Sequence, residues 1–334
     1  MEIQIDPEAG EVPAKAGDAA ARPAAGRRVA KASLGNPTAS AYLRIFSAAS
    51  IVWFHTAPDG LIGRLGAVGL ALFVCLSFLH APGPKDFRAT VRRSARSLLA
   101  PWVFWWVFYA AIAAWVARGV PPLLGPETNV WLLLRGPAMH LWYLPFIFLA
   151  TIVVLAVRAA AVPLPIQIKT AAAIGFAAFG ILLLVQRPEL PPPLSQMTNA
   201  LPGVALGLAY LWVMRTSDRR TRGKYFSAIA VLVSLACIPV WLFGNKDVAL
   251  GYTGASLAIM LMNARLPRKR FLMRLSVLSL GIYLIHPFAL MFIRKFLGAD
   301  LSEFVLAPMA FTMSAVIAWG MRKTPLLKHL LSSP

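Results

Sequence analysis

Ten blocks of about twenty apolar residues are the feature that most limits what this chain can fold into. An α-helix rises about 1.5 Å per residue, so each block is long enough to cross the hydrocarbon core of a bilayer. Hydrophobic residues make up 58% of the 334 and charged residues only 14%. The sequence therefore predicts an all-α, polytopic membrane protein with about ten transmembrane helices. Windows of about nineteen residues place the spans at 41–57, 62–81, 98–117, 141–157, 167–186, 197–214, 225–243, 247–263, 272–292 and 303–321.

The loops between these blocks alternate in charge. Three loops are strongly basic: "KDFRATVRRSAR", "RTSDRRTRGK" and "RLPRKRFLMR". Three others are nearly neutral: "RPELPPPLSQ", "FGNKD" and "LGADLSE". Because basic loops stay in the cytoplasm, this pattern places both termini and most of the 33 lysines and arginines on the cytoplasmic side. That asymmetry accounts for the net charge of +20 without a nucleic-acid partner.

The two ends of the chain differ from the apolar region between them. Residues 1–40 are polar and contain no apolar core of a secretory signal. Such a composition buries too little apolar surface to fold alone, so we expect a disordered cytoplasmic tail. The membrane domain is predicted at 41–321, and a short basic cytoplasmic tail at 322–334. Cys75 and Cys237 lie inside apolar blocks, which favours buried thiols over a disulfide or a thiolate metal site.

Three histidines are predicted to lie at one depth, near the outer face. His55 ends the first span, which runs outward, and His140 opens the fourth, which runs inward. His286 lies about two thirds of the way along the outward-running ninth span. A single histidine at a helix end is more often a hydrogen-bonded interfacial residue, but neutral imidazole is also the natural base for taking a proton from a hydroxyl. Asp59, four residues after His55, is a candidate to orient that imidazole.

A metal site and proton-coupled transport are both disfavoured. No two of these histidines have the spacing of zinc ligands on one helix, and all thirteen acidic residues lie in the tail, in loops or at span ends. No metal is therefore expected. The absence of a carboxylate at mid-membrane also argues against a transporter that relays protons through Asp or Glu.

Arginines mark the predicted cytoplasmic side. Arg44 lies in the first span, although an arginine at a helix centre costs roughly 2.5 to 3.5 kcal/mol. Eleven residues at about 100° each bring His55 to within about 20° of the direction of Arg44, so both face one way. Arg93 and Arg96 precede the third span, one helical turn apart, and two guanidinium groups at that spacing can grip a phosphate. Anchoring of the span by positive charge is the competing interpretation.

Taken in order, these residues resemble acyltransferase family 3, integral-membrane O-acyltransferases that decorate bacterial glycans. Arg44 and His55 match the family's first-helix pattern of Arg, ten residues, His. Arg93 and Arg96, followed by "LLAPW", match its Arg, two residues, Arg pattern. The further matching segments are "GAVGLALFVCLSFL", "HLWYLP" and "IYLIH", and the resemblance runs over about 41–321.

The resemblance implies a reaction and a set of roles. A CoA thioester, usually acetyl-CoA, would enter from the cytoplasm and bind at Arg44, Arg93 and Arg96. His55 would be the catalytic base acting on a hydroxyl of a glycan or lipid-linked sugar near the outer side. The substrate-binding residues would be His140, Trp142, Tyr143, Ser279, Tyr283 and His286.

The predicted function is therefore a membrane-bound O-acetyltransferase that modifies polysaccharide or glycolipid at the bacterial inner (plasma) membrane. Its partners would be acyl-CoA, the sugar acceptor and the lipid bilayer. The alternative is a non-enzymatic glycan or lipid translocator that uses the same aromatic and histidine surface as a passage.

Overall fold

The computed structural model describes residues 36–58, 60–79, 86–117, 130–186, 190–215, 218–298, 301–325 and 327–331. All regular structure within these ranges is helical, which confirms the predicted all-α class. The longer helices are α1 (Pro37–Thr56), α2 (Leu61–Leu79), α4 (Ala100–Ala117), α6 (Tyr143–Ala160), α7 (Ile166–Leu183), α8 (Leu194–Met214), α9 (Arg219–Phe243), α10 (Lys246–Ile259), α12 (Ser279–Leu297) and α13 (Glu303–Lys323). The shorter ones are α3 (Phe87–Ser94), α5 (Val130–Arg135) and α11 (Arg270–Ser276). Residues 1–35 of the predicted tail, and Asp59, lie outside the described residues.

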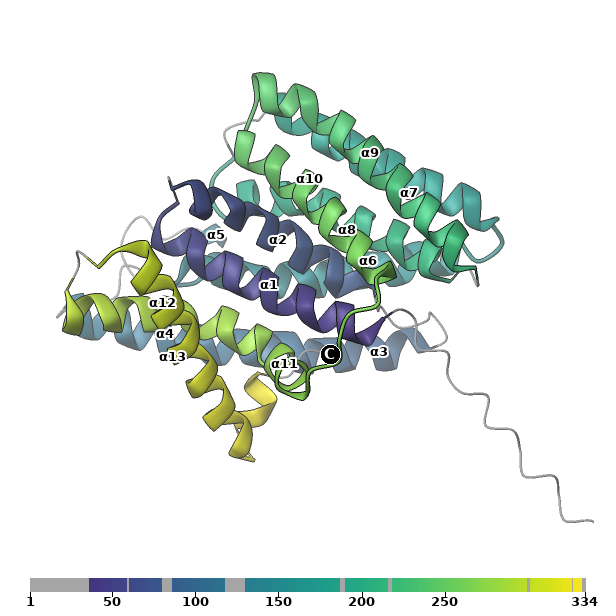
Figure 1. Ribbon diagram of the computed structural model, residues 1–334. Coiled ribbons are helices and arrows are strands. Elements are labelled where there is room, and N and C mark those ends of the chain that lie inside the picture. Colours follow the sequence, from purple (N-terminus) through teal and green to yellow (C-terminus); the bar gives the residue numbers. More distant parts are fainter. Residues whose placement is uncertain are drawn as a thin grey trace, which may run out of the picture. The chain divides into compact units, whose positions relative to one another are not determined.

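Eight helical segments of the described chain are long and apolar enough to cross a membrane. This agrees with a polytopic membrane protein. The predicted spans 41–57 and 247–263 correspond to α1 and α10, which are not among the eight. Helix α1 carries Arg44 and His55 among several serines, and α10 ends after 14 residues in a 3₁₀ turn, Met260–Asn263. Both nevertheless pack against α2 (Figure 1). The count of ten spans and the cytoplasmic termini remain predictions.

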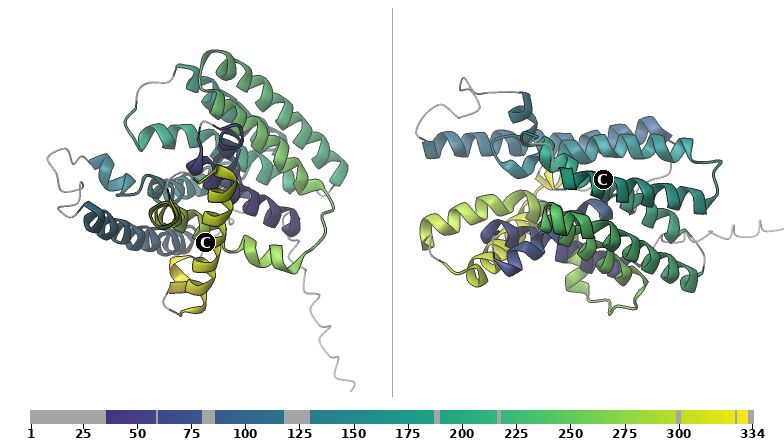
Figure 2. Two further views of the ribbon diagram at one scale, coloured as in Figure 1. Left: turned by 60° about the vertical axis from the view of Figure 1, so that its left-hand side comes forward. Right: turned by 90° about the horizontal axis from the view of Figure 1, so that it is seen from above.

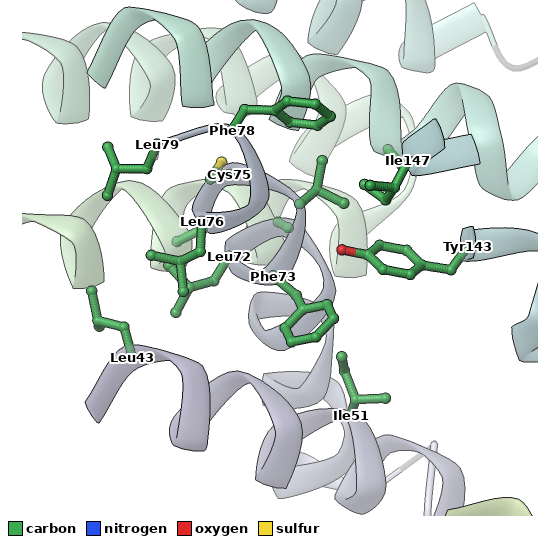
Figure 3. Packing of buried hydrophobic residues seen from close by; sticks show 14 of the residues in the cluster. Leu43, Ile51, Leu72, Phe73, Cys75, Leu76, Phe78, Leu79, Tyr143 and Ile147 are labelled. Carbon is green, nitrogen blue, oxygen red and sulfur yellow. The ribbon is translucent and has the colours of Figure 1, made fainter. Parts of the chain in front are cut away.

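Helix α2 is the central packing element of the described chain. It contacts α1, α8 and α10, and the buried side chains of Leu76 and Phe78 leave it in different directions (Figure 3). A Cβ on Gly66 would lie 2.6 Å from a backbone carbonyl oxygen of α1. A Cβ on Gly207 of α8 would lie 2.7 Å from a carbonyl of α2, and one on Gly251 of α10 would lie 2.9 Å from another. Small residues thus bring three helices against α2 at close range, as in membrane bundles.

Two groups of helices lie on either side of this centre. Helices α7, α9 and α10 pack together on one side, and α12 and α13 pack together beside α1 on the other. Figure 1 labels both groups, and Figure 2 shows them from two further directions. Cys75 and Cys237 are free thiols and are buried, as predicted.

Polar contacts hold both ends of α1. Asn36 caps the first turn with its side-chain oxygen, and its Nδ2 donates to the carbonyl of Ala264 at 2.6 Å. At the other end, the indole Nε1 of Trp53 donates to a carboxylate oxygen of Glu303 at 3.2 Å. Arg294 donates to the carbonyl of the last residue of α1 at 3.3 Å. These contacts fix the rotation and the axial position of the helix that carries Arg44 and His55.

The helices depart from simple α-helical continuity in two places. A π-helical turn, Ala95–Leu99, joins α3 to α4, so Arg93 sits in α3 and Arg96 in the π-turn. The predicted ninth span, 272–292, is divided into α11 and α12, so His286 lies in the first half of α12 rather than two thirds of the way along a span.

Candidate functional site

The three predicted histidines come together in the structure. The ring centroids of His55 and His286 lie 5.0 Å apart, and those of His140 and His286 lie 5.5 Å apart. They arrive from α1, from α12 and from a 3₁₀ turn, Met139–Trp142, that leads into α6. His286 is fully buried and His140 is 4% exposed, whereas His55 is exposed. One accessible imidazole thus lies beside two buried ones.

A proline fixes the tautomer of His286. Pro287 lies inside α12 and has no N–H, so the carbonyl of Tyr283, four residues earlier, lacks its usual helical donor. His286 Nδ1 lies 2.7 Å from that carbonyl oxygen. Because a carbonyl only accepts, Nδ1 carries the proton and Nε2 holds the lone pair. That Nε2 is buried and has no hydrogen-bond partner among the described residues.

The neighbouring carbonyl of the same helix fixes His140. The Nε2 of His140 lies 3.2 Å from the carbonyl oxygen of Leu284 and is the donor there, so its Nδ1 is the unprotonated nitrogen. Tyr109 of α4 donates to the same carbonyl at 2.7 Å. In return, the hydroxyl of Tyr283 donates to the backbone carbonyl of His140 at 2.7 Å. A reciprocal pair of bonds therefore locks the 3₁₀ turn onto α12.

His55 is held differently from the other two. It makes no hydrogen bond to any described residue, and its ring contacts Phe54 and His286. It lines a pocket of about 370 Å³, together with His140, Tyr283 and Trp142. The imidazole, which bonds to no described residue, is thus directly accessible to a molecule in that pocket.

A second set of polar side chains completes the pocket and was missed by sequence reasoning. The set consists of Gln196, Asn199, Asn245 and Asp247, on α8 and at the start of α10. In the sequence these residues stand beside two of the nearly neutral loops, which are predicted to face outward. This shared location beside outward-facing loops was the available sign that the four residues could lie at one depth. Nothing in the residue spacing, however, indicates that α8 and α10 contribute to the same pocket.

Of the predicted aromatic residues, Tyr143 and Tyr283 pack behind the histidines. Their ring centroids lie 5.1 Å apart, and Phe73 of α2 stacks on Tyr283 at 5.7 Å. The hydroxyl of Tyr143 faces α2 (Figure 3) and is hydrogen-bonded to Ser77 at 2.9 Å. Arg44, which is half-buried, interacts electrostatically with Tyr143. Arg44 is therefore connected through aromatic rings to the histidine cluster.

Ser279 does not reach this cluster. It is the first residue of α12 and is buried, but it lies seven residues before His286, or roughly 10 Å along the helix. No described contact joins it to a histidine.

Arg93 and Arg96 also lie away from the histidines. Both side chains are exposed, and their helical segments pack against α6. Figure 1 shows α3 toward the same end of the bundle as the start of α1, and away from the end of α1 that carries His55. Arg158, near the end of α6, is 4% exposed and interacts electrostatically with Arg215 at the end of α8. Sequence reasoning did not single out this second pair of arginines, because its members are far apart in the chain.

Within the described part of the chain, no group of three His, Cys, Asp or Glu side chains could hold a metal ion.

The chain matches a known family over most of its length. A family model described as an acyltransferase domain matches residues 39–323. No curated protein and no solved structure matches significantly. With its long apolar helices, the chain is an integral membrane acyltransferase, and it belongs to acyltransferase family 3.

Proposed function

We propose that this protein transfers an acetyl or other short acyl group from acyl-CoA to a hydroxyl of a glycan or lipid-linked sugar at the bacterial inner membrane. The observation that carries the proposal is the exposed His55, which bonds to no described residue and lies in a pocket beside two buried histidines of fixed tautomer. A general base must reach the proton that it removes, and only His55 combines exposure with this neighbourhood.

In the reaction, His55 accepts the proton of the acceptor hydroxyl as the oxygen attacks the thioester carbonyl carbon. The new C–O bond forms and the C–S bond breaks. The proton on His55 then passes to the departing CoA sulfur, so the imidazole is neutral again after each turnover.

His286 is proposed to orient this base. Its Nε2, which has no partner among the described residues, can accept a hydrogen bond from the N–H of His55, whose ring lies 5.0 Å away, centroid to centroid. That bond would leave the other His55 nitrogen free to accept a proton. A buried acceptor without a donor is costly, so the site favours the His55 tautomer that supplies the donor.

The donor is proposed to extend from the cytoplasmic side toward His55. Arg44 lies eleven residues before His55 on one helix, or roughly 16 Å, a length that an extended pantetheine arm can span. Arg93 and Arg96 are exposed, and their guanidinium groups suit the phosphates of CoA. His140, Trp142, Tyr143 and Tyr283 then form the acceptor side, with Ser279 as a more distant support.

Purified protein incubated with radiolabelled acetyl-CoA and a lipid extract of its host tests the proposal. We expect label in a glycan or glycolipid and release of free CoA. Binding of acetyl-CoA or of the lipid without turnover contradicts transfer and favours the translocator.

A further inference from the structure

A tyrosine hydroxyl bridges two backbone groups of helix α8 beside the pocket. Pro202 interrupts the hydrogen bonding of this helix. The hydroxyl of Tyr252, from α10, donates to the carbonyl of Asn199 and accepts from the N–H of Gly203 at 3.2 Å. In an uninterrupted α-helix those two backbone groups bond directly to each other. Tyr252 therefore fixes the turn of α8 that carries Asn199 at the pocket wall.

The amide groups at this wall have unused hydrogen-bonding capacity. The Oδ1 of Asn199 is buried without a partner, and its side chain bonds to no described residue. The Oδ1 of Asn245 caps α10 by accepting from two backbone N–H groups, and its Nδ2 bonds to no described residue. The Oε1 of Gln196 accepts from Ser195 at 3.1 Å, and its amide nitrogen likewise bonds to no described residue. Three side-chain amides thus offer donors, and one also offers an acceptor.

A carboxylate stands in the same wall. Asp247 lines the pocket and forms no ion pair within the described ranges. The negative charge of a carboxylate repels an anion, and its oxygens accept hydrogen bonds from hydroxyl groups. The rest of the lining is largely apolar, with Phe54 and Leu70 among its members, and it suits the C–H face of a sugar ring.

We propose that Gln196, Asn199, Asn245 and Asp247 form an acceptor-recognition subsite that binds an uncharged sugar ring and rejects acidic sugars. This inference rests on the proposed function, because the bound sugar presents its hydroxyl to His55 across the same pocket. The amides form hydrogen bonds with the ring hydroxyls, and the carboxylate repels sugars that carry a negative charge.

The test uses the full-length protein in detergent, radiolabelled acetyl-CoA and the host lipid extract. Glycans are released from the product by mild acid and separated by anion exchange into neutral and acidic sugars. We expect the wild-type label in the neutral fraction. Asp247→Asn should raise the acidic share of the label about tenfold, since it removes the like charge while keeping the shape. Label that the wild-type protein places mainly in acidic sugars overturns the inference.

A second measurement separates recognition from folding and from donor binding. Asn199→Ala should raise the acceptor concentration for half-maximal transfer about tenfold and leave acetyl-CoA affinity unchanged, because the removed side chain bonds to no described residue. Asp218→Asn is the matched charge control, since Asp218 caps α9 outside the pocket and asparagine caps equally well. An unchanged acceptor requirement in Asn199→Ala overturns the subsite. No transfer by the wild-type protein overturns the proposed function itself.

Discussion

The ring centroids of His55 and His286 lie 5.0 Å apart, with the two ring planes tilted by 33°. The two side chains differ in burial and in hydrogen bonding. His286 is buried and bonded through Nδ1 to a carbonyl of its own helix, whereas His55 is exposed and bonds to no described residue. A fixed acceptor beside a free imidazole is a suitable arrangement for a base that must gain and lose a proton in each turnover.

His55→Gln should lower acyl transfer by a factor of about 10² to 10⁴, because glutamine keeps a polar side chain but cannot take a proton at neutral pH. Turnover of labelled acetyl-CoA measures the loss, and acyl-CoA binding should be nearly unchanged. Retention of more than about a tenth of wild-type turnover would assign the base role to another residue.

Pro287→Ala should lower transfer without destabilising the fold. The new backbone N–H competes with His286 Nδ1 for the carbonyl of Tyr283, so His286 loses its single tautomer. Nitrogen-15 NMR of the histidines, together with the transfer rate, measures both effects. Pro308→Ala is the control, since Pro308 also lies inside a helix, α13, but not beside a histidine. Equal activity losses in the two variants would contradict this role of Pro287.

Arg93→Ala with Arg96→Ala should weaken acyl-CoA binding while membrane insertion stays normal, because the basic loops keep many other charges. Calorimetry in detergent measures the affinity. The control pair is Arg220→Ala with Lys224→Ala, two exposed residues in the first turns of α9. If both pairs lower the affinity equally, the arginines act only through net charge.

Tyr252→Phe should lower the free energy of unfolding by about 0.5–1.5 kcal/mol for each hydrogen bond lost, since the Asn199 carbonyl and the Gly203 N–H both lose their bond to the Tyr252 hydroxyl. Denaturant titration in detergent measures this change. Tyr225→Phe is the control, because the Tyr225 hydroxyl bonds to no described residue. Equal stability of the two variants would show that the inserted hydroxyl contributes nothing.

Labelling of single cysteines tests the predicted orientation of the protein in the membrane. In a protein with Cys75→Ala and Cys237→Ala, a cysteine at Ser195 should react with an impermeant maleimide on spheroplasts, and one at Arg220 should react only after lysis. The positive-inside rule requires this because Arg220 lies in a basic segment and Ser195 in a neutral one. The reverse labelling pattern would invert the topology.

Much of the fold follows from the sequence, because apolar blocks of membrane length have few alternatives to helices. The meeting of His55, His140 and His286 could also be anticipated, since alternating loop charge assigns each a depth. Depth does not specify which helices are neighbours. The contribution of Asn199 and Asp247 depends on how α8 and α10 pack against α2, and the glycine contacts that set this packing carry no signal of pairing in a single sequence.

The π-turn between α3 and α4 has a consequence for how this helix tolerates changes in length. A π-turn is equivalent to one residue inserted into an α-helix, so deleting one residue within Ala95–Leu99 could restore regular helical winding. Everything on one side of the deletion would then rotate by about 100° relative to the other side. Arg93 would turn away from its present direction although no arginine had been replaced. The direction of this arginine side chain thus depends on the number of residues in the π-turn rather than on their types. Sequence comparisons that score only substitutions would overlook this dependence.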